Sequence, residues 1–92
     1  MSERFCDTVT VCNKLGLHIR PSRQVAELVQ KYDAKVTVIN GARSAGADSQ
    51  LDLLMLVASA GTELEICAEG PDAEEAVGAI VEIVENRFGE EN

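Results

Sequence analysis

Gly16-Leu17-His18-Ile19-Arg20-Pro21-Ser22 is the stretch that organises this chain of 92 residues, and it contains the only histidine. Residues 8–12 before it alternate in polarity, which predicts a half-buried strand. Proline is tolerated in a helix only within the first turn, so Pro21 predicts a helix that starts near Ile19 or Arg20. The stretch therefore predicts a strand that leads through a loop into a helix, with His18 at the helix start.

His18 is the candidate for chemistry because of this position. The first N–H groups of a helix, here those of Ile19 and Arg20, have no partner within the helix and favour an anion. The Arg20 guanidinium can add charge-assisted hydrogen bonds, and Gly16 permits a tight turn before the histidine. An imidazole nitrogen is nucleophilic near neutral pH. We therefore predict that His18 accepts a phosphoryl group.

The rest of the chain shows alternating strand and helix patterns. Helical spacing continues after Pro21 through Val25, Leu28, Val29 and Tyr32. Strands are expected at 35–39, at 42–47 as a weak edge strand after an Asn40-Gly41 hairpin turn, and at 62–68. Ser49 is expected to be the N-cap of a short helix whose apolar face consists of Leu51, Leu54 and Met55. A last helix opens at Asp72 and buries a stripe of Val77, Ile80, Val81, Val84 and Phe88, and residues 89–92 are expected to fray.

This order, β-α-β-β-α-β-α, predicts an α+β fold. It is an open-faced two-layer β-sandwich, in which three helices cover one face of a four-stranded antiparallel sheet. The length is that of a single domain, residues 1–92.

Composition restricts the class of function. Hydrophobic residues make up 46% of the chain and charged residues 26%, and the net charge is −8, which argues against nucleic-acid binding. Residues 1–46 hold seven basic and four acidic side chains, whereas residues 47–92 hold one basic and twelve acidic. No apolar run is long enough for a bilayer, and residues 1–7 lack a signal-peptide core. We therefore expect a cytoplasmic protein without membrane partners. We also expect it to be a monomer.

Three cysteines, Cys6, Cys12 and Cys67, lack both metal-ligand spacing and a Cys-x-x-Cys motif. We expect them to be reduced residues on strands, and we expect neither a metal nor another cofactor.

The heptapeptide 16–22 resembles the active-site loop of HPr, the histidine phosphocarrier of the bacterial phosphoenolpyruvate-dependent phosphotransferase system. The similarity extends over residues 8–88 and includes Asn40-Gly41, the Ser49 helix and Ala68-Glu69-Gly70. It implies that phospho-enzyme I phosphorylates His18 at Nδ1, that Arg20 contacts the phosphoryl group, and that the group passes to an enzyme IIA domain. Such a protein is a stoichiometric carrier of sugar transport and not an enzyme.

The resemblance also assigns roles to the Ser49 helix. Ser49 aligns with a serine that, in some bacteria, an HPr kinase/phosphorylase modifies, and Leu51, Leu54 and Met55 lie where partners dock. Asp48 and Gln50 depart from the usual context of that serine, and Ile19 and Ser22 replace the small alanines that are common beside the histidine.

Three alternatives remain open at this point. The first is a regulatory phosphoprotein of the nitrogen-type branch, which would use the same chemistry on His18. The second is an acylphosphatase-like enzyme that would use Asn40 and Arg43, although no glycine-rich cradle precedes a helix. The third is a binding module without phosphoryl chemistry, for which His18→Ala would leave function intact.

Overall fold

The structure is a computed structural model that describes residues 4–90. Four strands and three α-helices follow one another along the chain, with two single-turn 3₁₀ helices: β1 Arg4–Thr10, α1 Ile19–Leu28, η1 Val29–Lys31, β2 Lys35–Asn40, β3 Arg43–Gly46, α2 Gln50–Leu54, β4 Glu63–Glu69, α3 Ala73–Glu85 and η2 Arg87–Gly89. The element order is the predicted one. Among the described residues, no helix is long and apolar enough to cross a membrane.

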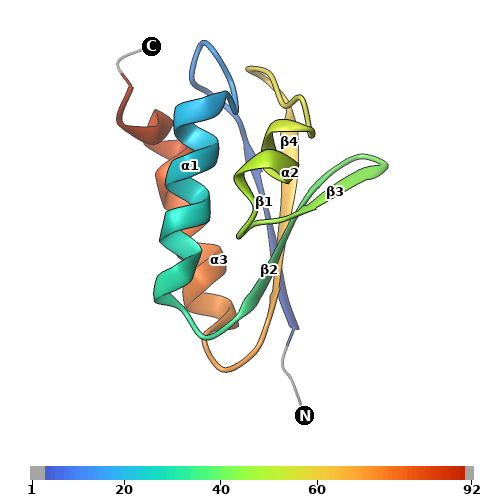
Figure 1. Cartoon of the computed structure of the whole chain (residues 1–92), viewed down its shortest axis with the longest axis vertical. Helices are drawn as coiled ribbons and strands as arrows, with labels where there is room; N and C mark the ends of the chain where they lie inside the picture. The colour runs from blue at the N-terminus through green and yellow to red at the C-terminus, as the bar shows by residue number, and fades with distance from the viewer. Residues whose placement is uncertain (1–3, 91–92) are drawn as a thin grey trace.

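The four strands form one antiparallel sheet with the order β1-β4-β2-β3. Helices α1 and α3 lie side by side against the sheet, and the short α2 packs near the start of α1 (Figure 1). Within residues 4–90, no helix packs on the other face of the sheet. This is the predicted open-faced α+β sandwich, with β3 at an edge as expected.

The core lies between the sheet and the helices. Alternate residues of the strands, including Val38, Leu64 and Ile66, meet Val25 of α1 and the stripe of α3. The predicted stripe is confirmed by the burial of Val77, Ile80, Val84 and Phe88, whereas Val81 is only partly buried.

The first strand was predicted too late in the chain. It runs over Arg4–Thr10 and not over residues 8–12. Of its residues only Val9 is buried, so the sequence has no hydrophobic alternation that would mark its beginning. Val11, just after the end of β1, is hydrogen-bonded to the residues that precede β4. Its N–H donates to the Thr62 carbonyl at 2.8 Å, and its carbonyl accepts from Gly61 N at 2.7 Å.

The apolar face predicted for the short helix does not face the core. Leu53 and Leu56 are buried there instead, whereas Leu51 and Met55 are 68% and 64% exposed and Leu54 is partly buried. The helix has only five residues, and every position from Leu51 to Leu56 except Asp52 is a leucine or a methionine. The sequence pattern is therefore compatible with several rotational settings of the helix. The N-cap at Ser49 is confirmed, since its side chain accepts a hydrogen bond from Asp52 N.

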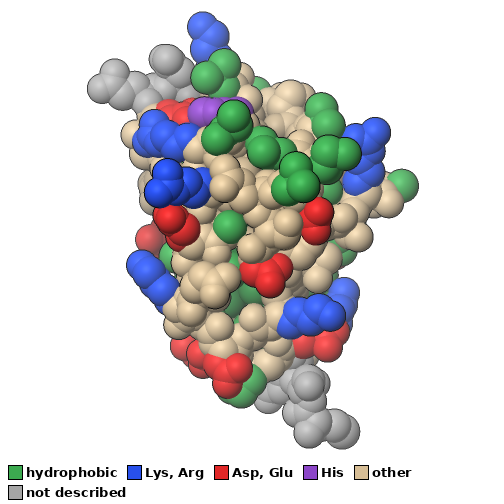
Figure 2. Space-filling view, viewed as in Figure 1, with side chains coloured by type: hydrophobic (Ala, Val, Ile, Leu, Met, Phe, Trp, Pro, Cys, Tyr) green, Lys and Arg blue, Asp and Glu red, His purple; other side chains and the backbone are tan. Residues whose placement is uncertain are grey.

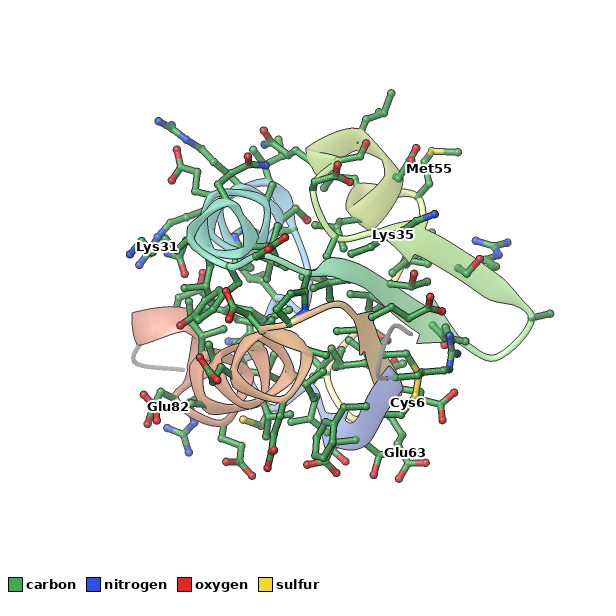
Figure 3. All side chains as sticks on the ribbon, turned by 90° about the horizontal axis from the view of Figure 1, so that it is seen from below. Cys6, Lys31, Lys35, Met55, Glu63 and Glu82 are labelled. Carbon is green, nitrogen blue, oxygen red and sulfur yellow. A yellow bond between two sulfur atoms is a disulfide. The ribbon has the colours of Figure 1, made fainter. Side chains whose placement is uncertain are left out.

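The prediction that all cysteines are reduced is wrong for two of them. Cys6 and Cys67 form a disulfide, visible as the yellow bond beside the Cys6 label in Figure 3, and Cys12 is free. The antiparallel register places Cys6 of β1 directly opposite Cys67 of β4. The two residues are 61 positions apart in the sequence, so only the strand pairing brings them together.

Candidate functional site

His18 is the N-cap of α1. Its backbone is extended, with φ −83° and ψ −165°, and its side chain makes no capping hydrogen bond. The carbonyl of His18 accepts the first helical bond from Ser22 N at 3.0 Å. The N–H groups of Ile19 and Arg20 precede that bond and have no acceptor within the helix. The predicted start of the helix is confirmed, and it leaves N–H donors on the two residues that follow the histidine.

The loop before His18 is fixed by a close backbone approach. Gly16 has φ +71°, and a Cβ atom built there would lie 2.4 Å from the Ala58 carbonyl oxygen. Leu17 N donates to that same oxygen at 2.8 Å. Only glycine combines this conformation with this contact, so position 16 determines how the loop presents the histidine.

A carboxylate from the other end of the chain holds the far nitrogen of the ring. Nε2 of His18 lies 2.7 Å from Oε2 of Glu90, whose side chain is only 13% exposed. The amide of Asn13, itself buried, donates to Oε1 of Glu90 at 2.9 Å and to the Gly16 carbonyl at 2.8 Å. Two segments far apart in the sequence, the loop of residues 13–18 and Glu90, therefore meet at this site.

The hydrogen bond from the Asn13 amide, supported by His18 and Arg20, holds the pKa of Glu90 below its usual value of 4.5, against the opposing effect of burial. At neutral pH Glu90 is therefore a carboxylate and can only accept a hydrogen bond. Nε2 must then be the nitrogen that carries the proton in the neutral ring. Nδ1, the nitrogen nearer to the backbone, keeps its lone pair for a nucleophilic role.

Arg20 belongs to the same cluster. Its guanidinium lies 3.8 Å from Oε2 of Glu90 and donates to the Phe88 carbonyl at 3.4 Å, and its side chain is 57% exposed. Most of its five N–H donors thus remain available to an anion at the ring. The structure brings Arg20 and His18 together around one carboxylate.

An apolar surface surrounds the histidine. Leu15, Leu54, Val57 and Ser59 line a shallow depression next to His18, and Figure 2 shows green side chains gathered beside the purple histidine. Large hydrophobic side chains that are about two-thirds exposed include Leu15, Ile19, Leu51, Met55 and Val57. The Gln50 amide donates to the Ile19 carbonyl at 3.3 Å and joins the start of α2 to the start of α1. The docking residues Leu51, Leu54 and Met55 predicted from the sequence are thus on the surface, or partly so, on a helix tied to the site.

The other residues singled out in the sequence have structural roles. Ser49 Oγ accepts from Asp52 N at 3.2 Å. The Asn40 amide donates to the Leu56 carbonyl at 2.9 Å, and Arg43 donates to the Met55 carbonyl at 3.3 Å. Asn40 and Arg43 therefore hold the end of α2 and form no phosphate cradle, which removes the basis of the acylphosphatase-like alternative.

Sequence reasoning missed Asn13 and Glu90. Residues 89–92 were expected to fray, but Phe88 is buried in η2 and Glu90 packs on the site, while 91–92 lie outside the described residues. Phe88 adopts φ +55°, a turn that a phenylalanine seldom makes and that the sequence does not announce. The 72 positions between His18 and Glu90 leave no local pattern that would pair them.

The fold and the site define a class: a small open-faced sandwich with one histidine at a helix start, supported by an arginine and a carboxylate. A sequence model described as the PTS HPr component phosphorylation site matches residues 5–86. The chain belongs to the HPr family of phosphocarrier proteins of the phosphotransferase system.

Individual relatives agree with this assignment. The chain is 42% identical over 82 residues to the phosphocarrier protein NPr of Shewanella violacea, covering 89% of this chain and 90% of that protein. It is 33% identical to the phosphocarrier protein HPr of Treponema pallidum, covering 91% and 96%. The crystal structure of HPr from Thermoanaerobacter tengcongensis superposes with a TM-score of 0.90 at 33% identity, covering 96% and 99% of the two chains.

Proposed function

We propose that this phosphocarrier accepts its phosphoryl group on Nδ1 of His18 from phospho-enzyme I and passes it to a histidine of an enzyme IIA domain. The observation that carries this proposal is the 2.7 Å contact between Nε2 and Glu90 at the open start of α1. It leaves Nδ1 as the nitrogen with a free electron pair.

The transfer needs no additional acid or base. The lone pair of Nδ1 forms the new N–P bond while the bond from phosphorus to the donor nitrogen breaks, and its electrons return to the donor ring. Nε2 keeps its proton throughout, so the phosphorylated imidazole carries a positive charge that faces the Glu90 carboxylate. The reverse displacement by a partner histidine then delivers the group onward.

Charge on the phosphoryl group is met by donors already in place. The N–H groups of Ile19 and Arg20 lie at the positive end of the α1 dipole. The exposed guanidinium of Arg20 can turn from Glu90 toward the phosphoryl oxygens. Because the site is open, the partner protein supplies the remainder of the surroundings, with the exposed side chains of Leu51 and Met55 as contacts.

The identities to known relatives bear on which branch of the phosphotransferase system the protein serves, sugar transport or nitrogen-type regulation. Two relatives named NPr share 42% and 40% identity with this chain, whereas two relatives named HPr share 33% and 36%. This difference favours the nitrogen-type regulatory branch as a second candidate beside sugar transport. Both need enzyme I and phosphoenolpyruvate, so we place the protein in the cytoplasm.

Modification of Ser49 by an HPr kinase/phosphorylase stays a prediction with less support. The Ser49 hydroxyl oxygen already caps α2, and Asp48 and Gln50 flank it on either side.

The test is intact mass after incubation with enzyme I and phosphoenolpyruvate. The protein is expected to gain one acid-labile phosphoryl group, His18→Ala is expected to gain none, and Arg23→Ala, a change at an exposed arginine paired with Glu27 on the same helix, is expected to behave as the unaltered chain. Loss of phosphorylation in both variants, or in neither, would contradict the assignment of His18.

The same phosphorylated protein separates the two branches. It is mixed with a sugar-type and with a nitrogen-type enzyme IIA domain, and transfer to each is followed by mass. Faster transfer to one of them assigns the branch, and transfer to neither would contradict the carrier role of this chain toward IIA domains.

A further inference from the structure

The Cys6–Cys67 disulfide lies apart from the phosphoryl chemistry, on the face of the sheet that no helix covers. Leu64, Ile66 and Ala68 of β4 point into the core, so the alternate residues Glu65 and Cys67 belong to the opposite face. Cys6 lies directly across from Cys67 on β1, and their Cα atoms are 4.1 Å apart. The bond therefore joins β1, at one edge of the sheet, to the adjacent strand β4.

The two cysteine residues differ in their exposure to solvent. Cys6 is an exposed residue of the edge strand, whereas Cys67 is 1% exposed on an interior strand between β1 and β2. A thiolate that attacks a disulfide must reach one sulfur along the S–S axis and expel the other. In this pair an attacking thiol can approach Cys6 from solvent, and Cys67 is left as the expelled sulfur.

We propose that Cys6 and Cys67 form a reversible thiol–disulfide exchange site for a small-molecule thiol, with Cys6 as the attacked sulfur and Cys67 as the leaving sulfur. The inference goes beyond the carrier function and rests on it only for the compartment. Thiol pools of the cytoplasm keep most protein cysteines reduced, so a solvent-accessible disulfide there is expected to cycle and not to remain permanently closed.

The reaction balances with two thiols. The first thiolate forms a mixed disulfide with Cys6 and breaks the Cys6–Cys67 bond, whose electron pair goes to the Cys67 sulfur, which takes a proton from water. The second thiolate attacks the small-molecule sulfur of the mixed disulfide, releases the oxidised small molecule and leaves Cys6 as a thiol. Two thiols are oxidised and one protein disulfide is reduced.

The neighbouring charges predict which thiols react faster. The Glu65 carboxylate lies within 4.8 Å of both sulfurs, and the nearby Arg4 is paired with Glu69 at 3.0 Å. The approach of a negatively charged thiol is therefore opposed. We expect cationic cysteamine to reduce the disulfide faster than anionic glutathione. We expect Glu65→Gln to bring the two reduction rates closer together.

The experiment uses the full chain carrying Cys12→Ser, which removes the free cysteine. The oxidised protein is incubated in glutathione buffers of graded ratio, quenched with an alkylating agent and weighed intact. We expect a native, folded protein that passes from no alkylated cysteine to two, through one glutathione adduct that peptide mapping assigns to Cys6. An adduct on Cys67, or a pair that stays unalkylated in excess thiol until the protein unfolds, would overturn the proposal.

Two single variants in the same background test the asymmetry directly. With oxidised glutathione, Cys67→Ser is expected to form the mixed disulfide about tenfold faster than Cys6→Ser, because reactivity follows access. Cys67→Ala replaces Cys67→Ser if the buried hydroxyl prevents folding. Equal rates, or a faster Cys6→Ser, would contradict the assigned roles. His18 phosphorylation, measured in parallel, is expected to be the same in the oxidised and reduced forms, so failure of this proposal is distinguishable from failure of the carrier function.

Discussion

Two helix starts in this small protein are built in opposite ways. Helix α2 begins at Ser49, whose hydroxyl oxygen accepts the Asp52 N–H and so satisfies the helix with its own side chain. Helix α1 begins at His18, whose ring makes no capping bond and turns its far nitrogen to Glu90 instead. At the start of α2, the Ser49 side chain thus accepts one of the N–H groups that the helix leaves without a partner. The uncapped start keeps its donors for an external anion, which suggests that an unfilled cap can mark a binding site.

The largest effect expected at the uncapped start, after loss of His18 itself, comes from Arg20. Arg20→Ala removes the guanidinium next to the ring, and the rate of phosphorylation by enzyme I is expected to fall about a hundredfold. Rapid-quench measurement of phosphoryl transfer checks this, with Arg23→Ala as the matched arginine control. An equal loss in both variants would show that general positive charge on α1, and not the position of Arg20, is responsible.

Glu90→Gln changes the charge beside the His18 ring and keeps the shape of the side chain. The variant removes the carboxylate that fixes the proton on Nε2, so phosphoryl transfer is expected to slow about tenfold. Nitrogen-15 spectra of the ring report the tautomer: the unaltered protein is expected to carry its proton on Nε2, and the variant a mixture of both forms. An unchanged tautomer with an unchanged rate would remove Glu90 from the mechanism.

The capped start predicts an effect on stability alone. Ser49→Ala removes the bond to Asp52 N and is expected to lower the free energy of unfolding by about 1 kcal/mol. Denaturant titration measures this, and Ser44→Ala at the exposed edge strand serves as the control. Phosphorylation of His18 is expected to be unaffected, and a parallel loss of transfer rate would mean that the two helix starts are coupled.

The smallest effect concerns pH. The pKa of Glu90 is lowered in the folded protein, so its contribution to stability is complete above the ordinary value of 4.5 and is lost as the pH falls through the lowered value. Glu90→Gln is therefore expected to melt a few degrees below the unaltered protein at neutral pH, and at the same temperature once the pH lies well below the lowered pKa of Glu90. A difference in melting temperature that persists at acid pH would mean that the glutamine destabilises the protein through packing and not through the loss of charge.

Local patterns in the sequence account for the architecture and for half of the site. Pro21 determines where α1 begins, and so His18 and Arg20 could be placed beside each other before any contact was known. Glu90 and Asn13 could not be placed, because their pairing depends on how the chain returns after α3. The same holds for Cys6 and Cys67, whose opposition depends on the register of β1 against β4.

An amphipathic pattern predicts the buried side of a helix only when the helix is long enough. The pattern predicted the buried stripe of α3, which has 13 residues. In α2, which has five residues, the predicted apolar face is not the buried one. From Leu51 to Leu56, which covers most of α2 and the two residues after it, every position except Asp52 is a leucine or a methionine. Periodicity therefore cannot distinguish Leu53, which is buried, from Leu51, which is exposed.

The position of Glu90 has a practical consequence for anyone who handles this protein. The two ends of the described chain lie at opposite ends of the molecule, with the carboxyl-terminal end next to the start of α1 (Figure 1). An affinity tag, fluorophore or fusion partner attached after Glu90 would begin beside His18 and would obstruct proteins that approach this residue. The amino-terminal end, beyond β1, is the side on which to immobilise or label this carrier.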